Sequence, residues 1–196
     1  MKIKHVTFLG SSQTQPGEKL YQDAYKAAAE VANAGYVVVN GAGPGIMRAS
    51  TDGAKSVGGK TIGITFEPKD MMLFEGRDKN NRVDQLIVLK NYVERTLKLL
   101  EIGEVYIIFN GGTGTISEFG MAWGLARLYF GHHKPLILFG NFWYPILEAF
   151  AQNMKLRGEE LKVYKIVDRV EDIVPTIKKF EEELGSNHAE TINQRA

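Results

Sequence analysis

Short apolar runs alternate with stretches of helical periodicity along almost the whole chain. The apolar runs are four or five residues long and rich in valine and isoleucine, which is typical of strands buried on both faces of a parallel sheet. Expected strands lie at residues 6–9, 36–39, 61–65, 85–89, 105–109, 135–139 and 163–167, and expected helices at residues 20–34, 46–54, 91–101, 115–128, 144–156 and 170–184. This order predicts an α/β fold: a Rossmann-like, doubly wound, mostly parallel sheet of about seven strands with helices on both faces.

The length and composition fit one such domain. We expect it at residues 1–184 of the 196, followed by a polar C-terminal tail at residues 185–196. A formal net charge of +1 does not indicate a nucleic-acid-binding surface. The absence of cysteine excludes disulfides, thiol catalysis and cysteine-ligated metals. No run approaches the ~20 apolar residues of a membrane helix, so we expect a cytoplasmic protein that binds neither nucleic acid nor membrane.

Three expected strands run into small or glycine-rich turns at their carboxyl ends. In an open α/β sheet, ligands bind at this edge, where the order of the strands reverses. Glycine lets the backbone approach a ligand closely, and the free N–H groups of a following helix attract phosphate. Three such turns therefore favour a phosphate-bearing ligand over three unrelated tight turns. The residues concerned are Gly10, Ser11 and Ser12; Gly41, Gly43 and Gly45, with Met47 just after them; and Gly111, Gly112, Thr113, Gly114 and Thr115.

Glu118 follows the third turn and allows two interpretations. An acidic side chain beside a phosphate site repels the anion, so its presence there indicates chemistry on the ligand rather than binding alone. The sequence Thr115-Ile116-Ser117-Glu118 also fits a capping box, in which Thr115 and Glu118 satisfy each other's backbone donors. The stretch alone leaves catalysis and capping open.

The glycine-rich turns match neither of two common nucleotide-binding motifs. The dinucleotide fingerprint needs Gly-x-Gly-x-x-Gly directly after the first strand, where this chain has Gly10-Ser11-Ser12. No Gly-Lys-Ser/Thr follows either glycine loop, so the P-loop pattern is absent too. A nicotinamide oxidoreductase and a nucleoside triphosphatase are therefore disfavoured. No His pair has helical metal spacing, and His132-His133 fits a turn before a strand, so we expect neither a metal nor a cofactor.

Two motifs carry a resemblance to the LOG (Lonely Guy) family. Residues 111–118 resemble the family signature Pro-Gly-Gly-x-Gly-Thr-x-x-Glu, and residues 41–47 resemble its glycine-rich loop ending in Gly-Leu/Ile-Met. The resemblance implies a Rossmann-like homodimer, or a higher homo-oligomer, that hydrolyses the N-glycosidic bond of a nucleoside 5′-monophosphate such as AMP or a cytokinin riboside monophosphate. The products would be the free base and ribose 5-phosphate. Many members were once labelled lysine decarboxylases, but no feature here predicts a pyridoxal phosphate site.

The resemblance also implies roles for single residues. The family's catalytic Glu falls on Glu118, and the catalytic Arg of its His-x-Arg-Lys helix motif falls on Arg95. The phosphate would sit on the third turn, with help from Ser11 and Ser12. The carboxylate can stabilise positive charge that develops on the ribose and activate the attacking water, while Arg95 keeps it ionised and clamps ligand oxygens. Without the resemblance, Arg95 would be interpreted as a solvent-facing helix cation.

Three residues depart from the family pattern and leave a second function open. Asn110 replaces the proline of the signature, and Val93 and Thr96 replace the histidine and the lysine of the arginine motif. Molybdenum cofactor carrier proteins use a similar fold to bind a phosphorylated pterin without this hydrolysis. The alternative is therefore a non-catalytic binding or carrier protein for a nucleotide-like phosphorylated ligand. The three turns disfavour a purely structural role.

Two further stretches have open roles. Residues 66–82 interrupt the alternation with a long loop, which we interpret either as a lid that selects the base or as a flexible surface loop. Trp123, Tyr129 and Phe130 could stack on a base, but their place on a helix after a buried strand favours core or dimer contacts.

Overall fold

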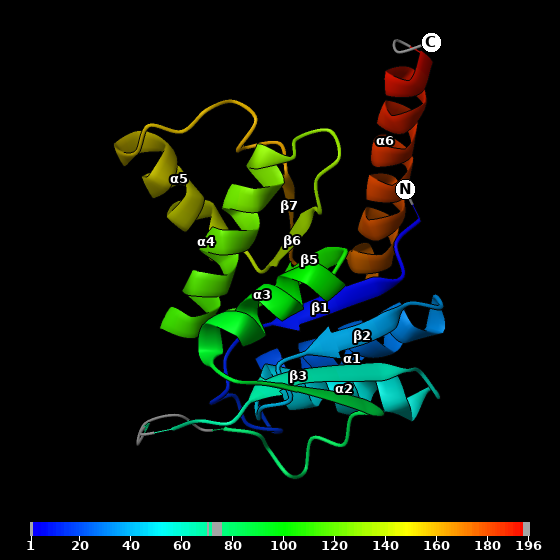
Figure 1. Ribbon diagram of the computed structural model, residues 1–196, viewed down its shortest axis with the longest axis vertical. Helices are drawn as coiled ribbons and strands as arrows, with labels where there is room; N and C mark the ends of the chain where they lie inside the picture. Colours follow the sequence, from blue (N-terminus) through cyan, green and yellow to red (C-terminus); the bar gives the residue numbers. More distant parts are fainter. Residues whose placement is uncertain (1, 70, 72–75, 194–196) are drawn as a thin grey trace.

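The computed structural model describes residues 2–69, 71 and 76–193, with only the backbone described for residues 186–193 (Figure 1). Its sheet consists of β1 (His5–Leu9), β2 (Val37–Asn40), β3 (Thr61–Phe66), β4 (Gln85–Leu89), β5 (Val105–Ile108), β6 (Leu136–Phe139) and β7 (Tyr164–Val167). The seven strands lie in the order β4-β3-β2-β1-β5-β6-β7, and every neighbouring pair is parallel. The predicted fold class is confirmed, and the sheet is parallel throughout the described residues.

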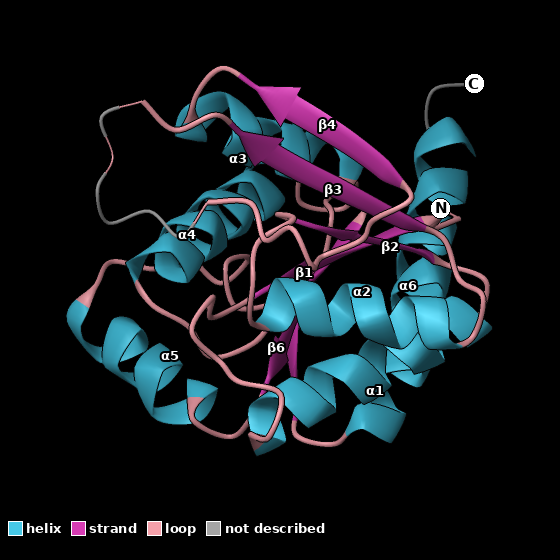
Figure 2. Ribbon diagram, turned by 90° about the horizontal axis from the view of Figure 1, so that it is seen from below, coloured by secondary structure: helices cyan, strands magenta, loops and turns pink. Residues whose placement is uncertain are grey.

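The helices form one layer on each face of the sheet (Figure 2). One layer holds α1 (Lys19–Asn33), α2 (Ile46–Ser56) and α6 (Ile173–Asn193), with the 3₁₀ turn η1 (Val170–Asp172) before α6; the other holds α3 (Tyr92–Ile102), α4 (Thr113–Leu128) and α5 (Trp143–Asn153). Each layer has its own apolar cluster, with Phe8 and Phe109 in the first and Phe119 and Trp143 in the second. This double cover explains why β5 and β6 are buried at every residue and consist of apolar residues alone.

The path of the chain across the sheet reverses beside β1. From β1 the chain moves outward through β2 and β3 to β4, then returns to β5 on the other side and continues to β6 and β7. The turns after β1 and β5 are therefore neighbours, and the Ser11 N–H donates to the Asn110 carbonyl at 3.0 Å. A crevice opens at such a reversal, which places the ligand site at the carboxyl ends of these central strands.

The described helices differ from their predicted bounds by a few residues, and the differences in α6 and α4 bear on the predicted tail and on the site. α6 continues past Leu184, where we expected the polar tail to begin, and reaches Asn193. Leu184 is buried against the core and the sequence after it is mostly polar, so the change in composition marks where the apolar face ends rather than where the helix ends. α4 starts at Thr113, inside the third turn. No described helix is long and apolar enough to cross a membrane.

Candidate active site

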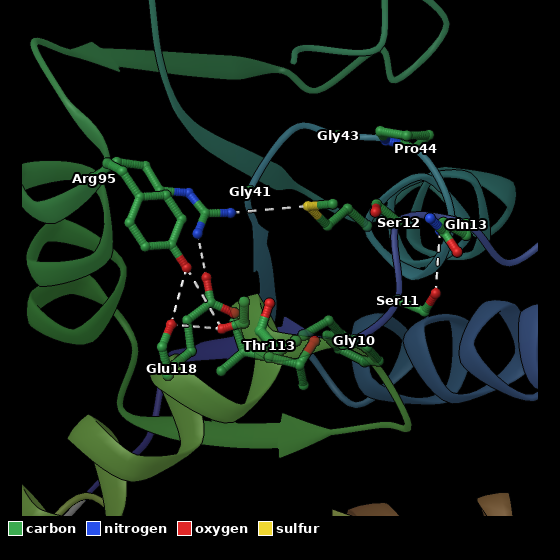
Figure 3. Close-up of a pocket in the computed structure, with 18 of the residues that line it drawn as sticks. Gly10, Ser11, Ser12, Gln13, Gly41, Gly43, Pro44, Arg95, Thr113 and Glu118 are labelled. Atoms are coloured by element: carbon green, nitrogen blue, oxygen red, sulfur yellow. Dashed lines mark hydrogen bonds and ion pairs between the residues drawn. The ribbon is translucent and has the colours of Figure 1, made fainter. Parts of the chain in front are cut away.

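A cavity of about 550 Å³ opens where the three small-residue turns meet (Figure 3). Its walls come from the turns after β1, β2 and β5 and from the first turns of α3 and α4. Of the residues predicted for the site, those that line it are Gly10, Ser11, Ser12, Gly41, Gly43, Met47, Arg95, Gly112, Thr113, Gly114, Thr115 and Glu118. The remaining two, Gly45 and Gly111, lie behind this lining. A Cβ on either glycine would come within 2.2 Å of a neighbouring oxygen, so both serve the close packing of the turns.

The amino end of α4 faces the cavity. Gly112 is the N-cap of this helix and offers no side chain to its first turn, whose residues Thr113, Gly114 and Thr115 line the cavity. The first N–H groups of a helix have no partner within the helix and carry its positive dipole end. A helix end of this kind can bind phosphate, so the geometry is compatible with the predicted phosphate site.

Glu118 and Arg95 form an ion pair in the wall of the cavity. Arg95 reaches from α3 and donates through Nη1 to Glu118 Oε1 on α4, and the two side chains point toward each other (Figure 3). Arg95 Nε also donates to the Ile64 carbonyl at 3.2 Å. Only 8% of Arg95 and 6% of Glu118 is exposed. The capping-box interpretation of Glu118 is wrong, because α4 begins two residues before Thr115. The interpretation of Arg95 as a solvent-facing cation is also wrong, because Arg95 is buried.

Opposing effects set the pKa of the Glu118 carboxyl. Burial raises its pKa because the charged form loses water, whereas the charge of Arg95 and its hydrogen bond lower it. Burial is the larger effect, so the pKa lies above its ordinary value. A raised carboxyl pKa suits a general base, since it brings the proton affinity of the base closer to neutral pH.

The glycine loop after β2 packs directly on the ion pair. A Cβ on Gly41 would lie 1.7 Å from Arg95 Nη2 and 2.8 Å from Met47 Sδ. The guanidinium therefore occupies the space that any other residue at position 41 would need. This contact gives a steric reason for glycine at the position, in addition to any contact with a ligand.

Two buried asparagines hold this loop in place, and the sequence interpretation missed both. Asn40 Oδ1 accepts from the Ala42 N–H at 2.9 Å, and Ala42 has a φ of 56°. Asn81 Nδ2 donates to the Gly43 carbonyl at 2.8 Å. The only signal for Asn40 is a polar residue at the end of an apolar strand. Asn81 belongs to the loop at residues 66–82, of which residues 70 and 72–75 lie outside the described part, so the lid interpretation stays a prediction.

The three departures from the LOG pattern lie outside the cavity lining. Val93 is 61% exposed on α3, Thr96 is buried beneath that helix, and Asn110 is exposed beside the turn. Trp123 is also remote from the lining: its ring stacks on Phe119 at 5.2 Å, in agreement with a core role.

The described residues offer no cluster of three or more histidine, aspartate or glutamate side chains that could hold a metal ion. The polar groups that line the cavity are backbone groups, hydroxyls, the Gln13 amide, one carboxylate and one guanidinium. This set suits an anionic ligand with a reacting centre beside the phosphate.

Comparison with known proteins agrees with this description of the fold. Residues 3–164 match the SLOG cluster4 family. The chain belongs to this family. Over 122 residues it is 31% identical to an uncharacterised protein of Archaeoglobus fulgidus, covering 62% of this chain and 75% of that one. It is also 31% identical over 122 residues to the cytokinin riboside 5′-monophosphate phosphoribohydrolase of Mycobacterium tuberculosis, covering 61% of this chain and 62% of that enzyme.

Solved structures of two molybdenum cofactor proteins share the fold of this SLOG cluster4 member. The molybdenum cofactor binding protein of Rippkaea orientalis superposes with a TM-score of 0.67 at 24% identity, covering 92% of this chain and 98% of that one. The molybdenum cofactor carrier protein of Chlamydomonas reinhardtii gives a TM-score of 0.67 at 20% identity, covering 91% and 98%. The resemblance to LOG enzymes stands as a distant similarity, at 31% identity over 122 residues.

Proposed function

We propose that this protein hydrolyses the N-glycosidic bond of a nucleoside 5′-monophosphate and releases the free base and ribose 5-phosphate. The observation that carries the proposal is the buried Glu118–Arg95 pair in the wall of a cavity that also presents the amino end of α4. A phosphate bound at that helix end would hold the sugar beside the carboxylate. The similarity to the Mycobacterium tuberculosis phosphoribohydrolase supports the same chemistry.

The reaction follows from the roles that these groups can take. The phosphate binds to the N–H groups of residues 112–115, and Arg95 contacts ligand oxygens while it holds Glu118 in place. As the bond from C1′ to the base breaks, its electron pair leaves with the base and positive charge develops on the ribose, which the Glu118 carboxylate stabilises. Glu118 then accepts a proton from the water that attacks C1′, and the departing base takes up a proton.

The test is to incubate the purified protein with AMP and with a cytokinin riboside 5′-monophosphate and to measure free base by chromatography. We expect base release from at least one of them, and a loss of about 10²-fold or more in the Glu118→Ala variant. The variant's melting temperature shows whether it is folded. If the wild type releases no more base than Glu118→Ala from any nucleoside monophosphate, the hydrolase proposal is wrong.

The second candidate is a binding or carrier protein for a nucleotide-like phosphorylated ligand. It is favoured by Val93 and Thr96, which replace two residues of the LOG arginine motif, and the solved carrier proteins have the same fold. This function predicts tight binding of a phosphorylated ligand without turnover. Base release at a catalytic rate would exclude it.

We further propose that the protein acts as a homodimer through an apolar face formed by α3 and α4. This α3–α4 face consists of Val93, Leu97, Leu125, Leu128 and Tyr129, which are between 39% and 66% exposed. Leu97, Leu125 and Tyr129 line one groove. Monomeric proteins rarely expose a large apolar patch, and a second copy would bury this one. Tyr129 and Phe130, at 64% and 43% exposed, do not belong to the core, and neither lines the cavity where a base would stack, so the dimer contact stays their predicted role.

A further inference from the structure

Tyr92 stands at the cavity beside the ion pair, and none of the roles above uses it. It is the first residue of α3, one helical turn before Arg95, and it lines the cavity. Its ring lies under the Arg95 guanidinium, whose Cζ is 5.7 Å from the ring centroid, and meets the edge of Phe66 at 5.9 Å between centroids. These contacts hold the ring in one position and aim its hydroxyl at the first turn of α4.

The hydroxyl of Tyr92 enters a directed chain of hydrogen bonds. Ser117 Oγ donates to the Gly114 carbonyl at 2.8 Å, which uses the only proton of the serine hydroxyl. Tyr92 Oη lies 3.0 Å from Ser117 Oγ, and because the Ser117–Gly114 bond is the shorter of the two bonds to the Gly114 carbonyl, we assign the proton in this second bond to the tyrosine. The Gly114 carbonyl itself is 3.5 Å from Tyr92 Oη, at the limit of a hydrogen bond. The phenol proton is thus committed to Ser117, and the phenol oxygen keeps lone pairs that can accept.

We propose that Tyr92 is a specificity-determining residue whose oxygen accepts a hydrogen bond from a ribose hydroxyl of the ligand. This inference rests on the proposed function, because it takes the phosphate to lie on the amino end of α4. A phosphate dianion has no proton to donate, so an accepting oxygen at this place disfavours the phosphate and suits a sugar hydroxyl. The Glu118 carboxylate, which pairs with Arg95 between α3 and α4, is also a hydrogen-bond acceptor.

This contact would make the site prefer a pentose phosphate that carries the hydroxyl over one that lacks it. A ligand without the matching hydroxyl would lose the hydrogen bond to the Tyr92 oxygen, which reduces affinity. The hydroxyl concerned is the one at C2 or C3 of the pentose. The ring of Tyr92 has a separate effect, since it packs on Arg95 whether or not the hydroxyl is present. The substitution Tyr92→Phe separates the two effects because it removes the oxygen and keeps the ring.

The experiment measures binding of ribose 5-phosphate and of its 2-deoxy and 3-deoxy analogues by calorimetry. These ligands carry no base, so hydrolysis does not complicate the measurement. For the wild type we expect one deoxy analogue to bind about tenfold more weakly than ribose 5-phosphate. In Tyr92→Phe we expect that preference to fall to about twofold or less, while the affinity for the same deoxy analogue is unchanged. Tyr144→Phe, which alters an exposed tyrosine of α5 outside the cavity, is the matched control.

The outcomes separate this inference from the proposed function. If the wild type binds ribose 5-phosphate but does not discriminate against either deoxy analogue, the role of Tyr92 is wrong and the phosphate site stands. The same holds if Tyr92→Phe keeps the full preference for the hydroxyl. If the wild type binds none of the three sugar phosphates, the pentose phosphate site itself is wrong and this inference falls with it.

Discussion

At the scale of the single residue, the balance of forces on Glu118 predicts the pH dependence of base release. A general base must be ionised, and burial raises the pKa of Glu118. Protonation therefore begins at a higher pH than it would for an exposed glutamate. We expect kcat/KM for AMP to fall on the acid side with a limb above pH 4.5, the ordinary value for this carboxyl. The measurement is a pH–rate profile at AMP concentrations well below KM.

A control is needed because the second ionisation of a phosphate, with a pKa of about 6, also titrates in this range. Glu118→Gln keeps the size of the side chain but cannot titrate, and we expect it to be about 10²–10⁴-fold slower. If the fall in rate on the acid side persists in this variant, it is caused by protonation of the phosphate. A wild-type limb below pH 4.5 would contradict the effect of burial on Glu118.

At the scale of the element, the turn before α2 depends on one backbone conformation. Gly45 has a φ of 66° and a ψ of −129°, and a Cβ there would lie 2.2 Å from the Ser11 carbonyl oxygen. The same oxygen accepts from the Ile46 N–H at 2.9 Å, so the first and second turns are joined at this point. We expect Gly45→Ala to lower the free energy of unfolding by about 1–3 kcal/mol and to weaken ligand binding. Urea denaturation measures the first effect.

Gly17→Ala is the matched control, because a Cβ at Gly17 would meet no atom within 4 Å and its φ is not in the left-handed region. We expect that change to alter stability by less than about 0.5 kcal/mol. Equal losses for Gly45→Ala and Gly17→Ala would show that the turn has no special requirement for glycine.

Asn40 holds the glycine loop after β2 in place through buried hydrogen bonds. Its side chain accepts from the Ala42 N–H and donates to Ser50 Oγ at 3.1 Å and Thr51 Oγ1 at 2.8 Å, all of them buried. With about 1 kcal/mol for each lost bond, Asn40→Ala should reduce the free energy of unfolding by about 3 kcal/mol. Chemical denaturation checks this value.

Asn153→Ala is the control for that loss. The Asn153 side chain also makes one hydrogen bond, to the Ala149 carbonyl at 2.9 Å, but it is exposed to water at the end of α5. Its removal should change stability by no more than about 0.5 kcal/mol. If Asn40→Ala costs no more than this control, the buried network does not hold the loop.

The contrast between these elements and the site shows what the sequence can predict. Strand and helix positions follow from local periodicity, and the observed bounds lie close to the predicted ones for most elements. The three turns also carry a local signal, since glycine clusters directly after apolar runs. By contrast, Asn81 contacts Gly43 across 38 positions of sequence, and no local pattern marks it. The same holds for Tyr92 and Ser117, which the fold brings together from two helices.

At the scale of the whole molecule, the α3–α4 face should control assembly. Leu125 is 39% exposed and lies in an apolar groove with Leu97 and Tyr129, on the two helices that also carry Arg95 and Glu118. A glutamate at Leu125 would place an unpaired charge in the dimer contact, so we expect Leu125→Glu to weaken the dimer at least about 100-fold and to give a monomer by light scattering. Leu161→Glu changes a leucine that is 45% exposed outside this face and should remain dimeric. A wild type that is monomeric at all concentrations, or a Leu125→Glu variant that stays dimeric, would rule out this face as the interface.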